Sequence, residues 1–256
     1  MKRYLFVLLL CICTLGFVAC SHKGNGEKVT YRFAPIIGQS MEYTTTSVIE
    51  TSFFWQPITF TNKVKTKETP ISKENGIFTL MSQIEDLSTT VSDPKANAAI
   101  QEEVQSTKAK IIGTHIFTKV DEQGNVVAEP HHEGISAEEA KILTQDNLGI
   151  EMVYRMKFFP EHAITVGDTW ENEMQRNRTR ANIKYKLEQL DDTSMTVSFT
   201  GTVQSTIKEN KKWVLQVEGK RQFDRSTGVP IPGTTKVRMT GNTDQEGGKI
   251  TLTSTM

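Results

Sequence analysis

The chain of 256 residues contains little cysteine, with three residues in all. Cys11 and Cys13 lie inside an apolar N-terminal run, and Cys20 follows directly after it. If that run is removed, one cysteine remains, so no intramolecular disulfide can form. A chain of this length can bury an adequate core without one. We therefore expect packing rather than cross-linking to stabilise the fold.

The sequence also lacks an apolar run long enough for a membrane span and an excess of either charge. The run from Tyr4 to Val18 has about 15 residues, below the roughly 20 that a spanning helix needs. Lys2 and Arg3 precede it, which is typical of a signal peptide that is removed. The 30 basic residues equal the 30 acidic ones. This balance predicts no nucleic-acid partner, because such binding requires a concentrated basic face.

Catalytic and metal-binding signatures are missing as well. A Gly-x-Ser-x-Gly motif does not occur, although a non-local triad leaves a hydrolase open as an alternative. His131 and His132 are adjacent, so on a strand they would point to opposite faces; a surface loop is the better interpretation. The sequence therefore predicts a protein that is not an enzyme and holds no cofactor or metal.

The segment that ends at Cys20 predicts the organisation of the chain. Gly16-Phe17-Val18-Ala19-Cys20 resembles a bacterial lipobox, although Phe17 stands where such motifs prefer leucine. The resemblance implies that residues 1–19 are a signal peptide and that Cys20 is lipidated. Two or three acyl chains would then anchor the protein stably to a membrane, whereas a single chain would bind only marginally. We expect residues 20–28 to be a lipidated tether and residues 29–256 a single β-rich domain.

Alternation of apolar and polar residues dominates the domain and predicts antiparallel strands. The alternation is clearest after residue 180, where successive strands form a meander with one apolar and one wet face. We expect strands at 29–33, 41–50, 58–69, 77–91, 110–120, 126–128, 183–188, 195–203, 213–223, 229–239 and 250–256.

Helical patterns occur only in the middle of the chain. Residues 96–106 are rich in alanine, and Ser136 with Glu139 fits a capping box that opens a helix to Gln145. A further helix is expected at 150–158. A sheet that is wet on one face needs a cover on the other. We therefore predict a mainly β fold with minor α: a curved antiparallel sheet or half-barrel of about ten strands, covered by two or three helices.

The phrase from Pro160 to Trp170 contains Val-Gly-Asp-Thr-Trp and is the most distinctive part of the sequence. Together with the turns at 121–124 and 224–228, it resembles a family of uncharacterised Bacteroidetes lipoproteins. The family has no established activity, so the resemblance implies no functional residues. In such bacteria, surface lipoproteins often carry an acidic run after the cysteine, which Ser21-His22-Lys23 lacks. This favours an outer-membrane anchor that faces the periplasm.

The expected architecture is similar to the half-barrels of periplasmic lipoprotein carriers, which bind acyl chains between sheet and helices. Our first hypothesis is a cell-envelope lipoprotein that binds a hydrophobic ligand or lipid in that place. The candidate ligand-binding residues are the apolar side chains of Phe53, Phe54, Trp55, Met152 and Met156. The alternative is an envelope interaction or scaffold module that binds a protein partner through the aromatic patch at 53–55.

Overall fold

The computed structural model describes residues 26–53, 56–128, 130–135, 158–176, 179–206, 212–242 and 249–255. These residues form eleven strands and one helix, in keeping with a mainly β fold. The elements are β1 (Met41–Phe53), β2 (Gln56–Glu74), β3 (Ile77–Val91), α2 (Pro94–Ile111), β4 (His115–Asp121), β5 (His131–Glu133), β6 (Thr169–Arg176), β7 (Thr179–Leu190), β8 (Ser194–Thr206), β9 (Lys212–Asp224), β10 (Lys236–Asn242) and β11 (Lys249–Thr255).

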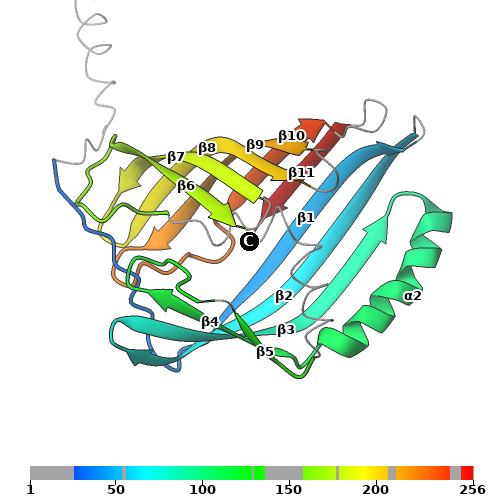
Figure 1. The fold of residues 1–256 in the computed structure, drawn as a ribbon, viewed down its shortest axis with the longest axis horizontal. Coiled ribbons are helices and arrows are strands. Elements are labelled where there is room, and N and C mark those ends of the chain that lie inside the picture. Colours follow the sequence, from blue (N-terminus) through cyan, green and yellow to red (C-terminus); the bar gives the residue numbers. More distant parts are fainter. Residues whose placement is uncertain are drawn as a thin grey trace, which may run out of the picture.

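All strand pairs are antiparallel, in the order β5-β4-β3-β2-β1-β11-β10-β9-β8-β7-β6. Figure 1 shows two five-stranded blocks, β1–β5 and β6–β10, with β11 between β1 and β10. The order ends at β5 and β6, and no pairing among the described residues joins these two strands. The sheet is therefore open, and neither block closes or curls strongly. The mainly β class is confirmed, and the half-barrel stays a prediction.

Within the β6–β10 block, β7, β8 and β9 follow the predicted meander. Along β7, buried and exposed side chains alternate without a break from Thr179 to Leu187. Ala181, Ile183 and Tyr185 belong to its buried set. This period of two places every second side chain on the same face.

The inner faces of the two blocks meet in one hydrophobic core. Phe78 and Val120 from the first block belong to the same cluster as Tyr185 and Phe223 from the second. Loop segments complete it: Phe159 stacks on Tyr31 at 3.6 Å between ring centroids. Among the described residues, aromatic side chains from loops therefore cover the β6–β10 block where helices were expected.

Residues 29–34 cross from one block to the other, and we call them the crossing segment. The Phe33 amide donates to the carbonyl of Glu122, which follows β4, at 2.6 Å. The next amide, that of Ala34, donates to the carbonyl of Thr227, which follows β9, at 2.7 Å. The predicted strand at 29–33 is thus a non-strand connection with one isolated bridge. Its hydrogen bonds go to turns because both blocks present turns at this end.

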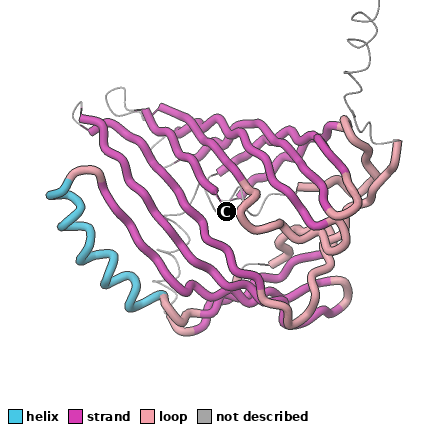
Figure 2. The backbone as a smooth tube through the Cα atoms, turned by 180° about the vertical axis from the view of Figure 1, so that it is seen from behind, coloured by secondary structure: helices cyan, strands magenta, loops and turns pink. Residues whose placement is uncertain are grey.

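Helix α2 lies along the edge of β3 (Figure 2). β4 pairs only with the first half of β3, from Ile77 to Gln83, so the second half needs another neighbour. The amide of Val91 donates to the Asn97 side chain at 3.0 Å, and the Gln101 side chain donates to the carbonyl of Thr89 at 2.7 Å. The helix therefore protects the strand edge and does not cover the apolar face.

Several predicted boundaries were wrong for local reasons. α2 extends to Ile111, so residues 110 and 111, the start of the strand expected at 110–120, are helical. β10 begins at Lys236, since residues 225–235 form turns instead of a strand. Besides β3, β4 pairs with β5 and not with the strand expected at 126–128, where Val126 makes one isolated bridge. The helix expected at 136–145, and that at 150–158 apart from Phe158, lie outside the described residues. No helix of the described chain is long and apolar enough to cross a bilayer.

Candidate functional site

A set of apolar side chains on the inner face of the first block lies outside the main core. Ile49 pairs with Phe60, and Val64 pairs with Thr45 on one side and Leu87 on the other. All five are half-buried, and none belongs to the cluster that unites the two blocks. We call Thr45, Ile49, Phe60, Val64 and Leu87 the β1–β3 inner surface. It offers apolar contact area beside a filled core.

A row of short polar side chains crosses the same face. Ser47 pairs with Asn62, which pairs with Thr89, so the three lie side by side. The row separates the pair Ile49–Phe60 from the pair Thr45–Val64. The face therefore combines apolar stripes with hydroxyl and amide groups. This composition is typical of sites for mostly apolar small molecules, in which a few polar groups orient the ligand.

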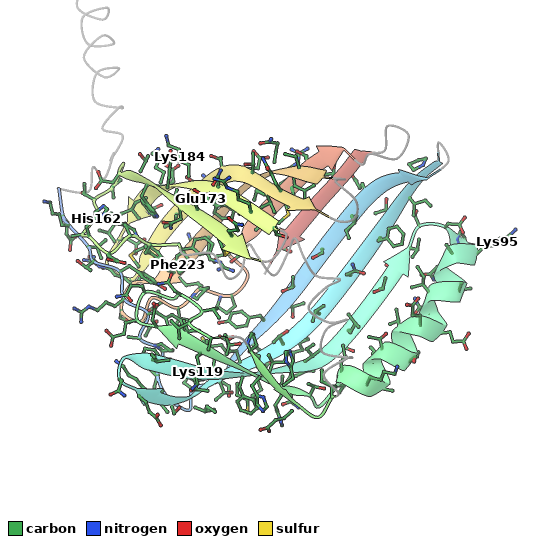
Figure 3. The ribbon with its side chains drawn as sticks, in the orientation of Figure 1. Lys95, Lys119, His162, Glu173, Lys184 and Phe223 are labelled. Atoms are coloured by element: carbon green, nitrogen blue, oxygen red, sulfur yellow. The ribbon has the colours of Figure 1, made fainter. Side chains whose placement is uncertain are left out.

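A charged residue lies buried where this surface meets the core. Arg221 of β9 is 3% exposed, and its guanidinium carbon lies 4.9 Å from the ring centroid of Phe158 and 5.9 Å from that of Phe223. Its Nε donates to the Thr235 hydroxyl at 2.9 Å. Figure 3 shows Phe223 between the two blocks, so Arg221 brings a positive charge into the interior.

Two tyrosines accompany Arg221, and we call Tyr43, Tyr185 and Arg221 the border group. The Tyr185 ring centroid lies 5.4 Å from that of Phe158, and Tyr185 is 1% exposed. Its buried hydroxyl has no hydrogen-bond partner in the described part of the chain. The Tyr43 hydroxyl donates to the Met41 sulfur at 3.3 Å, and a thioether is a weak acceptor. Both hydroxyls thus retain capacity for a better partner.

The charge of Arg221 acts on both tyrosines of the border group. Burial raises the pKa of Tyr43 and of Tyr185 well above the ordinary value, and the positive charge of Arg221 opposes that rise at both. The carboxylate of Glu68 contributes to the raised pKa of Tyr43. Both phenols are therefore neutral hydrogen-bond donors at neutral pH.

The outer face of the second block is polar and paired. Arg238 and Glu218 lie 3.8 Å apart beside a shallow groove of about 440 Å³, which Thr200, Gln216 and Thr240 also line. Figure 3 shows Lys184 and Glu173 on this side of the block. Exposed pairs of this kind contribute little to stability. The groove lies on solvated strands, away from the border group.

The residues predicted to bind a ligand are only partly placed. Phe53 is the last residue of β1 and pairs with Gln56 of β2. Phe54, Trp55, Met152 and Met156 lie outside the described residues, as does the lipidation candidate Cys20. Ligand binding by these residues therefore stays a prediction, as does the scaffold alternative that depends on the patch at 53–55.

The described residues hold no group of three or more histidine, cysteine, aspartate or glutamate side chains that could bind a metal. His131 and Glu133 belong to strand β5, where their nearest side-chain atoms lie 3.7 Å apart. The surface loop expected for these histidines is thus an edge strand, because it pairs with β4.

Sequence reasoning missed Arg221 because the alternation of β9 was followed only through its apolar members. The residue stands between Gly219 and Phe223 in the inward register, where an uncharged side chain is the norm. A charge at an inward position was therefore the available signal. The alternation over 183–188 puts Tyr185 on the apolar face, but a missing hydrogen bond cannot be read from a pattern.

Comparisons with known proteins add little about activity. No curated protein matches the chain. Among solved structures, the chain is similar to DynF from the dynemicin biosynthesis pathway of Micromonospora chersina, with 7% identity, 91% of this chain and 85% of that chain covered, and a TM-score of 0.24. A TM-score this low carries no argument about fold or function. Residues 143–252 match a domain of unknown function, the Family of unknown function (DUF6263).

Proposed function

We propose that this protein is a non-enzymatic cell-envelope lipoprotein that binds a hydrophobic ligand, such as a lipid, against the β1–β3 inner surface. The observation that supports the proposal most directly is the difference between the two blocks. In the second block, the inward side chains of β7 are buried and form part of the core. In the first block, the inward side chains of Ile49, Phe60, Val64 and Leu87 stay half-buried.

The energetic reason is the apolar area that a ligand would remove from water. Burying one such side chain fully contributes about 1.5–3 kcal/mol. Four half-buried side chains therefore offer enough for useful affinity, although association entropy offsets much of it. Asn62 and Thr89, the half-buried members of the polar row, would orient the ligand across the strands.

The proposal also covers the architecture and the cellular location of the protein. We infer that the two blocks serve as the walls of a half-barrel, in analogy to periplasmic lipoprotein carriers and to the Bacteroidetes lipoprotein family that the sequence resembles. Acylation of Cys20 would tie the domain to the outer membrane on the periplasmic side. Metabolic labelling with a fatty acid tests this part, because Cys20→Ala should abolish incorporation and release the protein from membranes.

The ligand itself is tested with two neighbouring residues of β1. Val48 and Ile49 are both half-buried but point to opposite faces. Mature protein purified from membranes should carry a small apolar molecule in native mass spectrometry. We expect Ile49→Asn to weaken its retention about tenfold or more, since it removes apolar contact worth at least 1.4 kcal/mol.

The matched variant Val48→Asn places the same polar group on the outer face and should leave the bound molecule unchanged. Equal losses in the two variants would indicate general destabilisation instead of a site. Protein that is empty in the wild type, with no uptake of added lipid, would refute ligand binding altogether.

A further inference from the structure

Not every charge on the outer face of the second block is paired. Four carboxylates on this face each lie beside a basic side chain, in the pairs Glu173–Arg180, Glu171–Lys184, Glu188–Lys186 and Glu218–Arg238. Lys220 of β9 and Lys236 of β10 are exposed, and neither lies within ion-pair distance of a carboxylate in the described part of the chain. This face therefore carries a surplus of positive charge, although the formal charge of the whole chain is zero.

The two unpaired lysines stand directly opposite each other on neighbouring strands. Like charges in this position repel each other and destabilise a sheet. Strand register extends this pair into a row without an acidic residue, which we call the basic row: Lys186, Ser198, Lys220, Lys236 and Thr255. The carboxylate of Glu188 beside the row already accepts from Lys186 at 2.8 Å and from the Ser198 hydroxyl at 2.7 Å. An anion above Lys220 and Lys236 would relieve a repulsion that the fold leaves in place.

Resting on the proposed acylation of Cys20, we infer that the basic row docks the second block on the anionic head groups of a phospholipid membrane. Anionic lipids attract lysine and arginine side chains that come close to the membrane surface. This attraction needs exposed charge and no preformed cavity, and Lys220 and Lys236 provide such charge. A lysine ammonium on its flexible stem meets a phosphate as a point charge, which suits a surface of mobile head groups.

The start of the domain keeps this block close to the proposed anchor. Glu27 forms an ion pair with Arg225, which follows the last residue of β9, and Figure 1 shows the first described residues beside the second block. The seven residues 20–26 span at most about 25 Å when they are fully extended. Lys220 lies four residues before the end of β9, or about 13 Å along the strand. The acyl chains would therefore enter a membrane within reach of the basic row.

The distribution of charge favours the outer face of the block over its end. The turns at the end, next to Glu27, carry the carboxylates of Asp191, Asp192 and Asp224. Hydrogen bonds from the amides and hydroxyls of these turns hold the pKa of Asp191 and of Asp224 below the ordinary value, so both are ionised at neutral pH. Their negative charges repel an anionic surface that approaches end-on. The block is therefore expected to lie against the lipid through the face that carries the basic row.

The shallow groove of about 440 Å³ beside the basic row gives a head group room. Thr200 of β8 lines it together with Arg238 and Thr240 of β10, and Arg238 stands two residues from Lys236 on the same face. Glu218 also lines the groove, but its ion pair with Arg238 is exposed and 3.8 Å long, so it contributes little. A phosphate can therefore compete for the guanidinium and accept from the threonine hydroxyls.

Vesicle binding tests the inference without the acyl chains. The mature protein with Cys20→Ala is mixed with vesicles of phosphatidylcholine, either alone or with added phosphatidylglycerol, and sedimentation measures the bound fraction. We expect binding to the anionic vesicles that declines as salt is added, since salt screens exposed charges. Lys220→Gln and Lys236→Gln should each weaken this binding about fivefold, as for the loss of one basic side chain at an anionic surface.

Two controls separate the basic row from general effects. Lys119→Gln removes the same charge from an exposed position of β4, and Figure 3 shows Lys119 and Lys184 on opposite sides of the molecule. This variant should bind as the wild type does. Lys220→Arg keeps the charge and should keep the binding. Because either glutamine substitution in the row ends the repulsion between Lys220 and Lys236, both variants should melt at the wild-type temperature or above it.

Equal binding to neutral and anionic vesicles, or equal losses in Lys119→Gln and Lys220→Gln, would refute docking through the basic row. Binding of heparin without binding of the vesicles would also refute it and would assign the face to a soluble polyanion. The measurement involves no acyl chain, so its failure leaves the lipidation of Cys20 and the binding of an apolar ligand standing. A failure of fatty-acid labelling, in turn, would refute the anchor and leave the vesicle result unchanged.

Discussion

Gly228 shows how a single residue ties the crossing segment to the second block. Its φ is +65°, and a Cβ at this position would lie 2.3 Å from the Arg32 carbonyl oxygen. Asp224 builds the turn before it, because its Oδ1 accepts from the amides of Ser226 at 3.0 Å and Thr227 at 2.8 Å. The Gly228 carbonyl then accepts from Tyr31. Only glycine permits both the conformation and the close approach.

We expect Gly228→Ala to lower the free energy of unfolding by about 1–3 kcal/mol for the backbone conformation alone. The crowding against Arg32 adds to this loss. Gly38→Ala is the control, since its φ is +82° but nothing lies within 4 Å of a Cβ there. Urea denaturation of both variants measures the difference. Equal losses would contradict the close approach at Gly228.

Among the elements, α2 protects the part of the β3 edge that β4 leaves unpaired. β3 is 15 residues long, but β4 covers only its first half. The helix begins after Asp93, whose side chain accepts from the Ala96 amide at 2.7 Å, with a proline in its first turn. Its first two turns then offer side chains to the open edge. The other two edges are β5, which is only three residues long, and β6, which carries Glu171 and Glu173.

We expect Asn97→Ala to expose the amide of Val91 to hydrogen exchange, because its acceptor is the Asn97 side chain. The lost hydrogen bond corresponds to about 0.5–1.5 kcal/mol of local stability. Gln105→Ala, at an exposed position of the same helix, should leave this amide as protected as in the wild type. Unchanged exchange at Val91 in Asn97→Ala would show that α2 does not guard the edge through this bond.

The molecule as a whole holds its phenols in a shared interior. Tyr31, Tyr43 and Tyr185 come from the crossing segment, the first block and the second block, and burial raises the pKa of each above the ordinary 10.0. The native state therefore keeps protons that the unfolded state releases above pH 10. Stability from these groups is complete below that pH and declines as the pH rises further.

An alkaline titration followed by the ultraviolet absorbance of phenolate checks this behaviour. The chain has five tyrosines, so we expect these three to ionise only together with the loss of circular dichroism that marks unfolding. Tyr185→Phe should remove one cooperative ionisation and shift unfolding to higher pH. Gradual ionisation of these three tyrosines in a folded protein would contradict the shared interior.

Much of the strand content follows from local pattern. The expected strand at 77–91 coincides with β3, and the strands expected at 195–203 and 213–223 lie within β8 and β9, because alternation along a half-buried strand is a local property. Residues 29–33 alternate equally well, yet they form a connection, since their partners are turns that lie far along the chain. The alternation of a segment shows which of its sides is apolar, but it does not determine which segment pairs with it.

By itself, the sequence determined the β class, the inward register of the C-terminal meander and the apolar character of one face, since each depends on residues a few positions apart. Only the tertiary structure decided that β11 pairs with β1 and that the crossing segment joins the blocks. It also decided that Arg221 lies beside Tyr185 near Phe158. These arrangements depend on contacts between distant segments, whose geometry arises when the whole chain packs.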